Sequence, residues 1–312
     1  MENIKCIFCD SESDEIFIKE NGYIGRKCQI CNLIYISPRP GLDEMIDIYG
    51  HDNAHISAQS HVEASSSKFL YAKHNLKILN KYAQDGKILE IGAGGGYFLN
   101  EARKQGFDVY GIELNKIQAN FIKEKLNIPC EESALSDKTF HDKKFDIIYH
   151  CDVISHFYDP IGEFKKSNLK LKRNGLVIFE TGNLGDVKKE YLKYITKFQY
   201  PDHLFFFSEQ NIKKLLEQTG FELLKIYKYS ILPQLFINKI LRKIINYIKP
   251  SRTFDNSNSQ NINKKLGNKE NKYKELLINI HSYIFYIIRY KLGLIIPKKK
   301  RPQTIIIIGR KK

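Results

Sequence analysis

The chain has 312 residues, enough for one large domain or two modest ones. Its hydrophobic fraction is 42%, and 19 Phe with 19 Tyr supply ample material for a packed core. The formal net charge is +15. Residues 1–5 show no apolar segment of a signal peptide, and six cysteines in such a chain indicate reduced thiols. Together these features argue against a disulfide-stapled secreted protein and predict a cytoplasmic location.

Four cysteines near the N-terminus form two pairs, each with two residues between its members. They are Cys6, Cys9, Cys28 and Cys31. Each pair offers two thiolates from one tight turn, and two pairs complete the tetrahedron that Zn²⁺ prefers. Because four thiolates leave no open coordination position, we predict a structural zinc ribbon over residues 1–42. Cys130 and Cys151 lie elsewhere and are predicted to be small buried hydrophobic residues.

Residues 43–86 are predicted to form a helical lid or linker. Within residues 69–82 one face is apolar, formed by Phe69, Ala72, Leu76 and Leu79. This spacing predicts an amphipathic helix that packs ahead of the first strand of the next domain. Three histidines in residues 51–61 are spaced irregularly on a polar stretch, so we expect solvated loop residues there rather than a second metal site.

Segment 87–99 is the part around which the rest is organised. A short apolar run typical of a buried parallel strand is followed by four glycines and then a helix. This order brings backbone N–H groups and a helix N-terminus to a nucleotide-like ligand. A dinucleotide-binding loop requires a small residue where Tyr97 stands. The segment instead resembles the E-x-G-x-G-x-G motif of class I S-adenosylmethionine (SAM) methyltransferases, which is matched by Glu90, Gly92, Gly94 and Gly96.

A second acidic residue supports the SAM interpretation. Residues 107–113 read as the next strand, and this strand ends in Glu113. A carboxylate at that point can accept hydrogen bonds from both hydroxyls of a ribose. Dinucleotide enzymes use the same device, so the acid discriminates only in combination with the glycine spacing. The combination predicts that Glu113 binds the cofactor.

The N-terminal region extends this resemblance. The second cysteine pair runs into an apolar segment and then into Pro38, Arg39 and Pro40. This arrangement resembles the zinc-ribbon-bearing SAM methyltransferases often associated with sugar, polysaccharide and natural-product pathways. The resemblance covers residues 6 to about 230, with a last strand that rejoins at 303–310. It implies an α/β fold with a Rossmann-like seven-stranded methyltransferase sheet and SAM as cofactor, and it leaves the acceptor open.

Residues 87–230 alternate strands with helices, which predicts a parallel sheet whose ligand lies beyond the strand C-termini. Glu131 follows the short third strand, where it would reach the adenine or remain exposed. Residues 150–160 follow the fourth strand and should border the methyl group, so His150 is included among the predicted cofactor-binding residues.

Two histidines are predicted to be catalytic. His156 lies in a stretch that resembles the family's Glu-His-x-x-Asp-Pro pattern, although Ser155 replaces the acid, which in some relatives helps to bind a metal. His203 lies in a segment that resembles the family's Pro-x-His pattern. An acceptor hydroxyl needs a base, and histidine is suited to that role at neutral pH. The alternative is that both histidines fix loops through backbone hydrogen bonds.

The C-terminal quarter has a different composition. Residues 231–312 contain 19 basic and 3 acidic residues, a net charge of +16, whereas the rest of the chain sums to −1. Residues 237–248 have the pattern of a basic amphipathic helix, and 273–296 that of a second, apolar helix. Between them, residues 250–272 are predicted to be a disordered linker.

We expect residues 231–301 to be a helical insertion and 302–312 to be the last, antiparallel strand of the sheet. The uncharged run 276–288 is too short to span a bilayer. The insertion is predicted to dock on an anionic membrane surface, and the alternatives are packing on the core or formation of a homodimer. The predicted location is therefore the cytoplasm, peripheral on the inner face of the plasma membrane.

The sequence predicts a SAM-dependent methyltransferase for a small-molecule acceptor such as a sugar, a nucleotide-sugar or a lipid-linked glycan in surface polysaccharide biosynthesis. One alternative is a nucleic-acid methyltransferase that uses the zinc ribbon and the basic region. It is disfavoured because no Asp-Pro-Pro-Tyr motif follows the fourth strand and Cys151 lacks a Pro-Cys context. A further alternative is a non-catalytic membrane-surface assembly protein with a methyltransferase fold.

Overall fold

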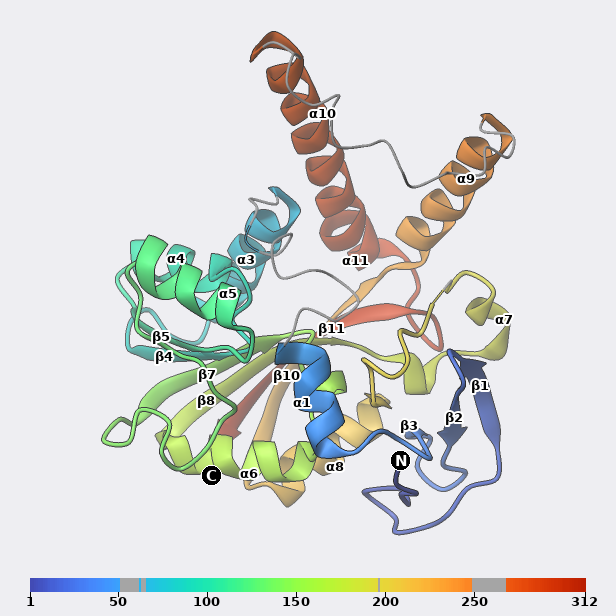
Figure 1. The fold of residues 1–312 in the computed structure, drawn as a ribbon, viewed down its shortest axis with the longest axis horizontal. Coiled ribbons are helices and arrows are strands. Elements are labelled where there is room, and N and C mark those ends of the chain that lie inside the picture. The colour runs from blue at the N-terminus through green and yellow to red at the C-terminus, as the bar shows by residue number, and fades with distance from the viewer. Residues whose placement is uncertain (51–61, 63–65, 196, 249–267) are drawn as a thin grey trace.

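The computed structural model describes residues 1–50, 62, 66–195, 197–248 and 268–312 (Figure 1). The three histidines of residues 51–61 and most of the predicted linker 250–272 lie outside the described residues. Predictions about them therefore stay predictions.

A central sheet has seven strands in the order β10-β11-β8-β7-β4-β5-β6. Their bounds are β4 (Lys87–Ile91), β5 (Asp108–Ile112), β6 (Cys130–Glu131), β7 (Phe145–Cys151), β8 (Leu171–Gly182), β10 (Phe221–Ser230) and β11 (Gln303–Lys311). Strand β11 lies antiparallel between β10 and β8, and the other neighbouring pairs are parallel. This confirms the predicted Rossmann-like methyltransferase sheet with its antiparallel last strand.

Helices cover both faces of the sheet because its strands are apolar on both sides. Successive strand residues point to opposite faces, so Ile88 and Leu89 belong to two different hydrophobic clusters. One face carries α3 (Ser66–Leu79), α4 (Tyr97–Lys104), α5 (Lys116–Asn120) and the π-helical segment η1 (Phe121–Lys125). The other carries α6 (Pro160–Lys170) and α8 (Glu209–Gln218).

A second, smaller sheet joins the cysteine-rich region to the methyltransferase core. Its order is β1 (Ile16–Glu20), β2 (Tyr23–Lys27), β3 (Ile34–Ile36) and β9 (Phe205–Phe206), all antiparallel. Strand β9 comes from the core, two residues after His203. The buried amide of Asn211 on α8 also donates to the carbonyl of Cys31 at 2.9 Å. The cysteine-rich region therefore positions the segment that carries His203.

The remaining short elements surround the sheet edge where the strands end. They are α1 (Leu42–Gly50), η2 (Ile154–His156), η3 (Leu184–Asp186) and α7 (Lys189–Leu192). The two 3₁₀ turns η2 and η3 directly follow β7 and β8. Helix α1 brings Tyr49 to the same edge, where its hydroxyl contacts His156.

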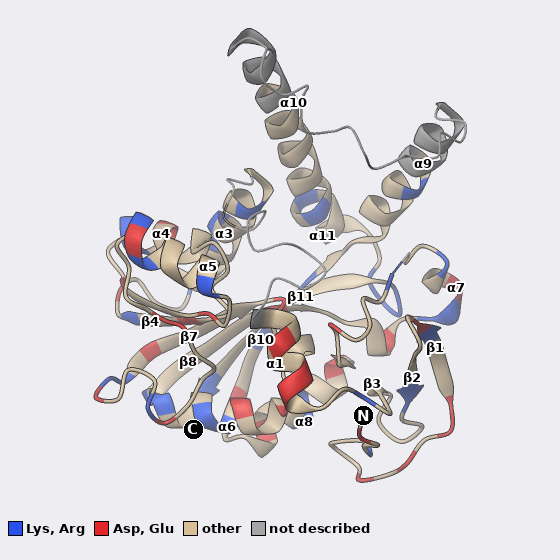
Figure 2. Ribbon diagram, viewed as in Figure 1, with Lys and Arg blue, Asp and Glu red and all other residues tan. Residues whose placement is uncertain are grey.

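The helical part of the C-terminal quarter projects away from the sheet, whereas its last strand, β11, lies within the sheet. Helices α9 (Leu232–Ile248) and α10 (Asn268–Ile287) rise as two diverging arms (Figure 1). Segments η4 (Ile288–Leu292) and α11 (Gly293–Ile295) then lead back to β11. The basic run 298–301 lies at the base of the arms (Figure 2). Within the described ranges, no helix combines the length and the hydrophobicity needed to cross a membrane.

One sequence prediction is wrong at its edge. Helix α10 begins at Asn268, so residues 268–272 are helical rather than part of a disordered linker. The physical reason is that extending an existing helix costs little, and Lys and Glu in this stretch are good helix formers.

Candidate active site

The glycine loop after β4 requires glycine for two separate reasons. Gly92 and Gly96 have φ values of +67° and +69°, in the left-handed region that disfavours other residues. A Cβ atom on Gly92 would lie 2.8 Å from Val153, which follows β7. A Cβ atom on Gly96 would lie 2.7 Å from Leu126. Gly92 therefore lets the loop approach the segment after β7, whereas Gly96 lets α4 pack against the end of η1.

A cavity of about 1220 Å³ opens at the C-terminal ends of the parallel strands. Several predicted site residues line it, from both the cofactor and the catalytic sets: Glu90, Gly92, Gly94, Glu113, His156 and His203. Three predicted residues are not among its lining: Gly96, Glu131 and His150. The topology thus brings most of the predicted site into one chamber.

Two carboxylates on adjacent strands face this cavity. The Glu113 carboxylate accepts hydrogen bonds from the backbone N–H of Gly94 at 2.8 Å and of Asn115 at 3.0 Å. Glu90 is 5% exposed, and its Oε2 has no hydrogen-bond partner among the described residues. Burial raises the pKa of Glu90 well above its ordinary value, with the charge of Glu113 as the next cause. Burial also raises the pKa of Glu113.

This pair of carboxylates fits SAM. SAM carries positive charge and ribose hydroxyls, and an orphaned buried carboxylate oxygen is complementary to a cation or a hydroxyl donor. The backbone hydrogen bonds that Glu113 accepts hold its carboxylate at the edge of the glycine loop. Glu90, Glu113 and the loop backbone are therefore the groups that would hold the cofactor.

The structure places His150 away from the cavity. In β7 its neighbours Tyr149 and Cys151 line the cavity, and His150 points to the opposite face because side chains alternate along a strand. Its ring stacks on Phe179 at a centroid distance of 4.8 Å, and burial lowers its pKa to about 3. The predicted cofactor contact of His150 therefore has no support in this geometry.

Glu131 is also engaged elsewhere. Its Oε1 accepts a hydrogen bond from the backbone N–H of Phe140 at 2.8 Å. The side chain thus anchors the loop that follows β6, and the contact with adenine stays a prediction.

The two candidate catalytic histidines meet at the far side of the cavity. Their ring centroids are 4.6 Å apart. His156 Nδ1 lies 2.9 Å from the carbonyl oxygen of Asp202 and 3.3 Å from its carboxylate. The Tyr49 hydroxyl donates its single proton to that carbonyl at 2.6 Å and lies 3.0 Å from His156 Nδ1. In the neutral ring Nδ1 therefore carries the proton, which leaves Nε2 as the unprotonated nitrogen.

Several cavity residues escaped the sequence analysis. Tyr49 and Asp202 lie beside His156, and only the adjacency of Asp202 to His203 could have signalled either of them. Asp152 follows β7 with a left-handed φ of +54° and opens into the cavity. Asp152 is exposed to the open cavity, yet the surrounding protein keeps bulk water from its carboxylate and raises its pKa to about 6, with the charge of Glu180 as the next cause.

The C-terminal insertion also contributes to the cavity wall. Arg289 from η4 donates through Nη2 to Glu180 at 2.7 Å and to Thr304 at 2.8 Å. Glu180, at the end of β8, is 1% exposed and also accepts from the Asn75 amide at 2.6 Å. Arg289, Thr304 and Asn75 all line the cavity. The insertion is thus fastened to the site by a buried ion pair.

The four N-terminal cysteines form a separate cluster. Their sulfur atoms lie within 4.8 Å of one another, and those of Cys6 and Cys31 are 3.5 Å apart. Sulfurs around a tetrahedral Zn²⁺ are about 3.8 Å apart, so the cluster fits the ion. The contact between the two sulfurs lowers the pKa of the Cys31 thiol to about 5 and raises the pKa of the Cys6 thiol, so of these two only Cys31 is favoured as a thiolate before a metal binds. His156, Asp202 and His203 form a second group with ligand atoms within 4.8 Å.

Comparison with known proteins identifies the class. A family model described as a methyltransferase domain matches residues 67–226, which is 160 of the 312 residues. The matched region contains the glycine loop, both cavity carboxylates and both histidines. The chain belongs to the class I SAM-dependent methyltransferases.

Curated relatives share this domain and differ in what their names say they act on. The ubiquinone biosynthesis O-methyltransferase of Pelagibacter ubique is 30% identical over 118 residues, which are 36% of this chain and 48% of that protein. The tRNA U34 carboxymethyltransferase of Helicobacter hepaticus is 32% identical over 111 residues, 31% of this chain and 35% of that protein. The chain thus spans less than half the length of either relative.

Solved structures with a similar arrangement include the MccD protein, with 13% identity, a TM-score of 0.49 and coverage of 77% of this chain and 97% of that one. Geranyl diphosphate C-methyltransferase from Streptomyces coelicolor has 14% identity, a TM-score of 0.48 and coverage of 78% and 77%. Because these TM-scores are below 0.5, the identification rests on the family model.

Proposed function

We propose that this chain binds SAM in the cavity and transfers a methyl group to a small-molecule acceptor: a sugar, a nucleotide-sugar or a lipid-linked glycan of surface polysaccharide biosynthesis. One observation carries the proposal. The carboxylates Glu90 and Glu113 and the paired histidines His156 and His203 line a single cavity. The choice of a sugar acceptor rests on the N-terminal resemblance, since the relatives named above act on other molecules.

In this proposal one set of residues binds the cofactor and another set acts on the acceptor. When bound, SAM supplies an electrophilic methyl group. Glu113 accepts hydrogen bonds from the ribose, and Glu90 faces the positive charge. On the other side, Nε2 of His156 or a ring nitrogen of His203 takes the proton of the acceptor hydroxyl, whose oxygen keeps the electron pair. The Asp202 carboxylate, 3.3 Å from His156 Nδ1, stabilises the imidazolium that results.

We also propose that one zinc ion is bound by the cysteine cluster and has a structural role. Four thiolates would fill its coordination shell and leave no position for a substrate. The ion would hold the small sheet that contains β9, and through it the segment with His203.

We further propose that the two arms dock on an anionic membrane surface, which would make the protein peripheral on the inner face of the plasma membrane. Large apolar side chains are exposed along the arms and at their base: Phe236, Ile240, Tyr283, Ile284, Ile287 and Ile295. The basic run 298–301 follows directly, and cationic residues beside exposed apolar ones suit an anionic leaflet. A homodimer built on the same surface is the competing explanation.

The catalytic assignment is tested by substitution. We expect His203→Ala and His156→Ala each to lower turnover by about 100-fold while leaving the affinity for SAM nearly unchanged. His141→Ala, an exposed histidine elsewhere, is the matched control. Acceptors would be found by mass spectrometry of glycans and nucleotide-sugars incubated with and without the protein, as a gain of one CH₂ unit. Wild-type rates in both histidine variants would contradict the assignment.

Two further measurements separate the alternatives. A non-catalytic assembly protein predicts no turnover with any acceptor fraction. A nucleic-acid methyltransferase predicts a salt-dependent gel shift with RNA or DNA. Metal analysis adds a check, because a second equivalent of metal would be consistent with an ion at His156, Asp202 and His203, which would compete with proton transfer to these histidines.

A further inference from the structure

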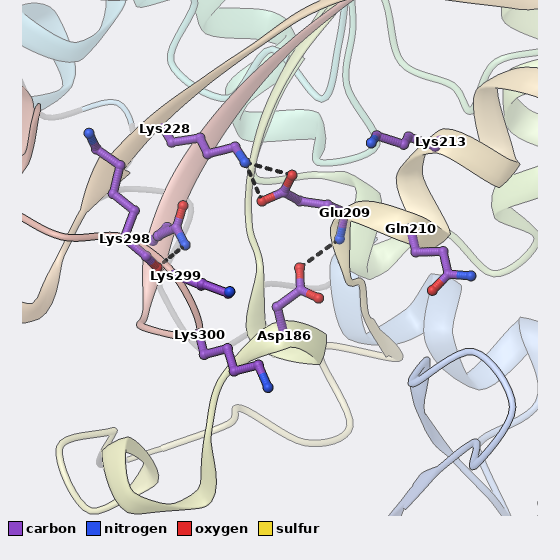
Figure 3. Close-up of a pocket in the computed structure, with 9 residues that line it drawn as sticks. Asp186, Glu209, Gln210, Lys213, Lys228, Lys298, Lys299 and Lys300 are labelled. Atoms are coloured by element: carbon purple, nitrogen blue, oxygen red, sulfur yellow. Dashed lines mark hydrogen bonds and ion pairs between the residues drawn. The ribbon is translucent and has the colours of Figure 1, made fainter.

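A second pocket, of about 460 Å³, lies where the N-terminal end of α8 meets the turn that follows α11 (Figure 3). Five lysines from three separate parts of the chain line it: Lys213, Lys228, Lys298, Lys299 and Lys300. Lys213 belongs to α8, Lys228 to β10, and the other three to the turn before β11. Segments distant in sequence therefore bring their positive charges to one hollow.

The two carboxylates of this pocket are already engaged. Glu209 forms an ion pair with Lys228 at 2.7 Å, and Asp186 accepts a hydrogen bond from the backbone N–H of Glu209 at 2.8 Å (Figure 3). In contrast, Lys213, Lys299 and Lys300 form no ion pair with any residue that the structure describes. Five lysines against two carboxylates leave an excess of three positive charges. Such an excess is complementary to a multiply charged anion.

The lysine pocket and the methyltransferase cavity share one buried wall residue. Gln303 lines both hollows and is 3% exposed. Its side-chain amide donates to the carbonyls of Lys298 at 2.6 Å and Arg301 at 3.3 Å. Its backbone N–H donates to Asn183, another residue of the cavity wall, at 2.9 Å. The lysine-bearing turn is thus held at a fixed place against the cavity.

We propose that the lysine pocket binds a phosphoryl group of the methyl acceptor. This inference rests on the proposed function and narrows it, because the acceptor must then carry a phosphate or diphosphate beside the group that is methylated. Nucleotide-sugars and lipid-linked sugars share this chemistry. Lysine ammonium groups are strong point-charge partners for phosphate oxygens, and the pocket is large enough for a diphosphate.

Inorganic pyrophosphate is the probe for this site, titrated into the full-length protein and followed by calorimetry. The variant Lys299→Gln/Lys300→Gln removes two of these positive charges and keeps a polar, slightly shorter side chain at each position. The matched control is Lys123→Gln/Lys125→Gln, which removes two exposed lysines of η1 on another part of the surface. We expect the wild type and the control to bind saturably, and the pocket variant to lose about tenfold or more in affinity. Equal affinity in all three proteins, or non-saturable binding by the wild type, would overturn the proposal.

Two competition arms identify the source of the phosphate. Displacement of pyrophosphate by uridine diphosphate supports a nucleotide-sugar acceptor, and displacement by a short-chain isoprenyl phosphate supports a lipid-linked one. Displacement by neither overturns the assignment to an acceptor. Each protein is also titrated with SAM, which should bind equally to all three. If the protein binds pyrophosphate but not SAM, the result contradicts the proposed methyl transfer, whereas the lysine pocket remains supported as an anion site.

Discussion

The sheet core, which includes β11, and the insertion of residues 231–301 differ in how much apolar surface they expose. In the core, Ile305 to Ile308 of β11 have no exposed surface, and residues 1–230 carry a net charge of −1. In the insertion, Ile284 and Ile295 are 48% and 79% exposed, and a run of basic residues follows them. The fold buries the first set of apolar side chains and leaves the second set exposed, and this exposure is the basis of the proposed membrane docking.

The two regions nevertheless meet at the candidate active site. Arg289 of the insertion lines the cavity and forms a buried ion pair with Glu180 of the core. The insertion therefore has two faces with different roles. One completes the cavity, and the other exposes the apolar side chains that we propose to dock on a membrane. Variants that disrupt only one of these faces test whether the two faces have separate roles.

The largest expected effect concerns the proposed zinc ribbon, whose stability would depend on its metal. Cys28 is fully buried, and Cys28→Ser should remove most of the zinc and unfold the ribbon, because structural zinc contributes on the order of 10 kcal/mol to such domains. Metal analysis and thermal unfolding measure both effects, and Cys130→Ala is the control that should keep the metal. A Cys28→Ser protein with one equivalent of zinc and full stability would count against the ribbon.

The next effect tests the joint between the two regions. Arg289→Met should lower the free energy of unfolding by about 3–5 kcal/mol, because it leaves the buried Glu180 carboxylate without its cationic partner. Chemical denaturation measures the change. The double variant Arg289→Met/Glu180→Gln should recover part of the loss. If Arg289→Met costs no more than a surface substitution, the insertion is an appendage rather than part of the site.

A smaller effect is expected at the cofactor carboxylate. Glu113→Ala should weaken SAM binding by about 2 kcal/mol, since charge-assisted hydrogen bonds to the ribose are lost. Glu131→Ala removes a carboxylate from the next strand, one that caps the backbone of Phe140, and should weaken SAM binding less. Calorimetry compares the two variants. An unchanged SAM affinity in Glu113→Ala would show that Glu113 does not bind the ribose.

The smallest effect per residue is expected at the outer face of the arms. Full-length protein should float with anionic vesicles and lose most binding in high salt, since each basic residue adds about 1 kcal/mol at an anionic surface. Ile284→Asp/Ile287→Asp on α10 should bind more weakly while keeping SAM affinity, which separates the outer face from the cavity wall. A wild-type protein that stays unbound with anionic vesicles would favour a homodimer instead.

The sequence predicted the sheet core well because the motifs that mark it lie close together along the chain. The glycine loop, Glu90 and Glu113 all lie within 24 residues of one another, and strand periodicity marks the sheet. The contacts of Tyr49 with Asp202 and of Arg289 with Glu180 join residues more than 100 positions apart. No local sequence pattern predicts such contacts. The predicted cofactor contact of His150 lacks support for a simpler reason. Side chains alternate along β7, and His150 lies on the face opposite the cavity.

Calorimetric titration of this chain with SAM is the most direct test of cofactor binding in the cavity. We expect saturable binding at one site per chain, with an affinity that rises with pH. The sign follows because burial raises the pKa of both Glu90 and Glu113, so that they hold protons above their ordinary titration range and lose them when the positively charged cofactor binds. Affinity should therefore increase as the pH passes through these raised pKa values and then level off. A folded chain that shows no saturable SAM binding at any pH would contradict the proposal that the cavity binds SAM.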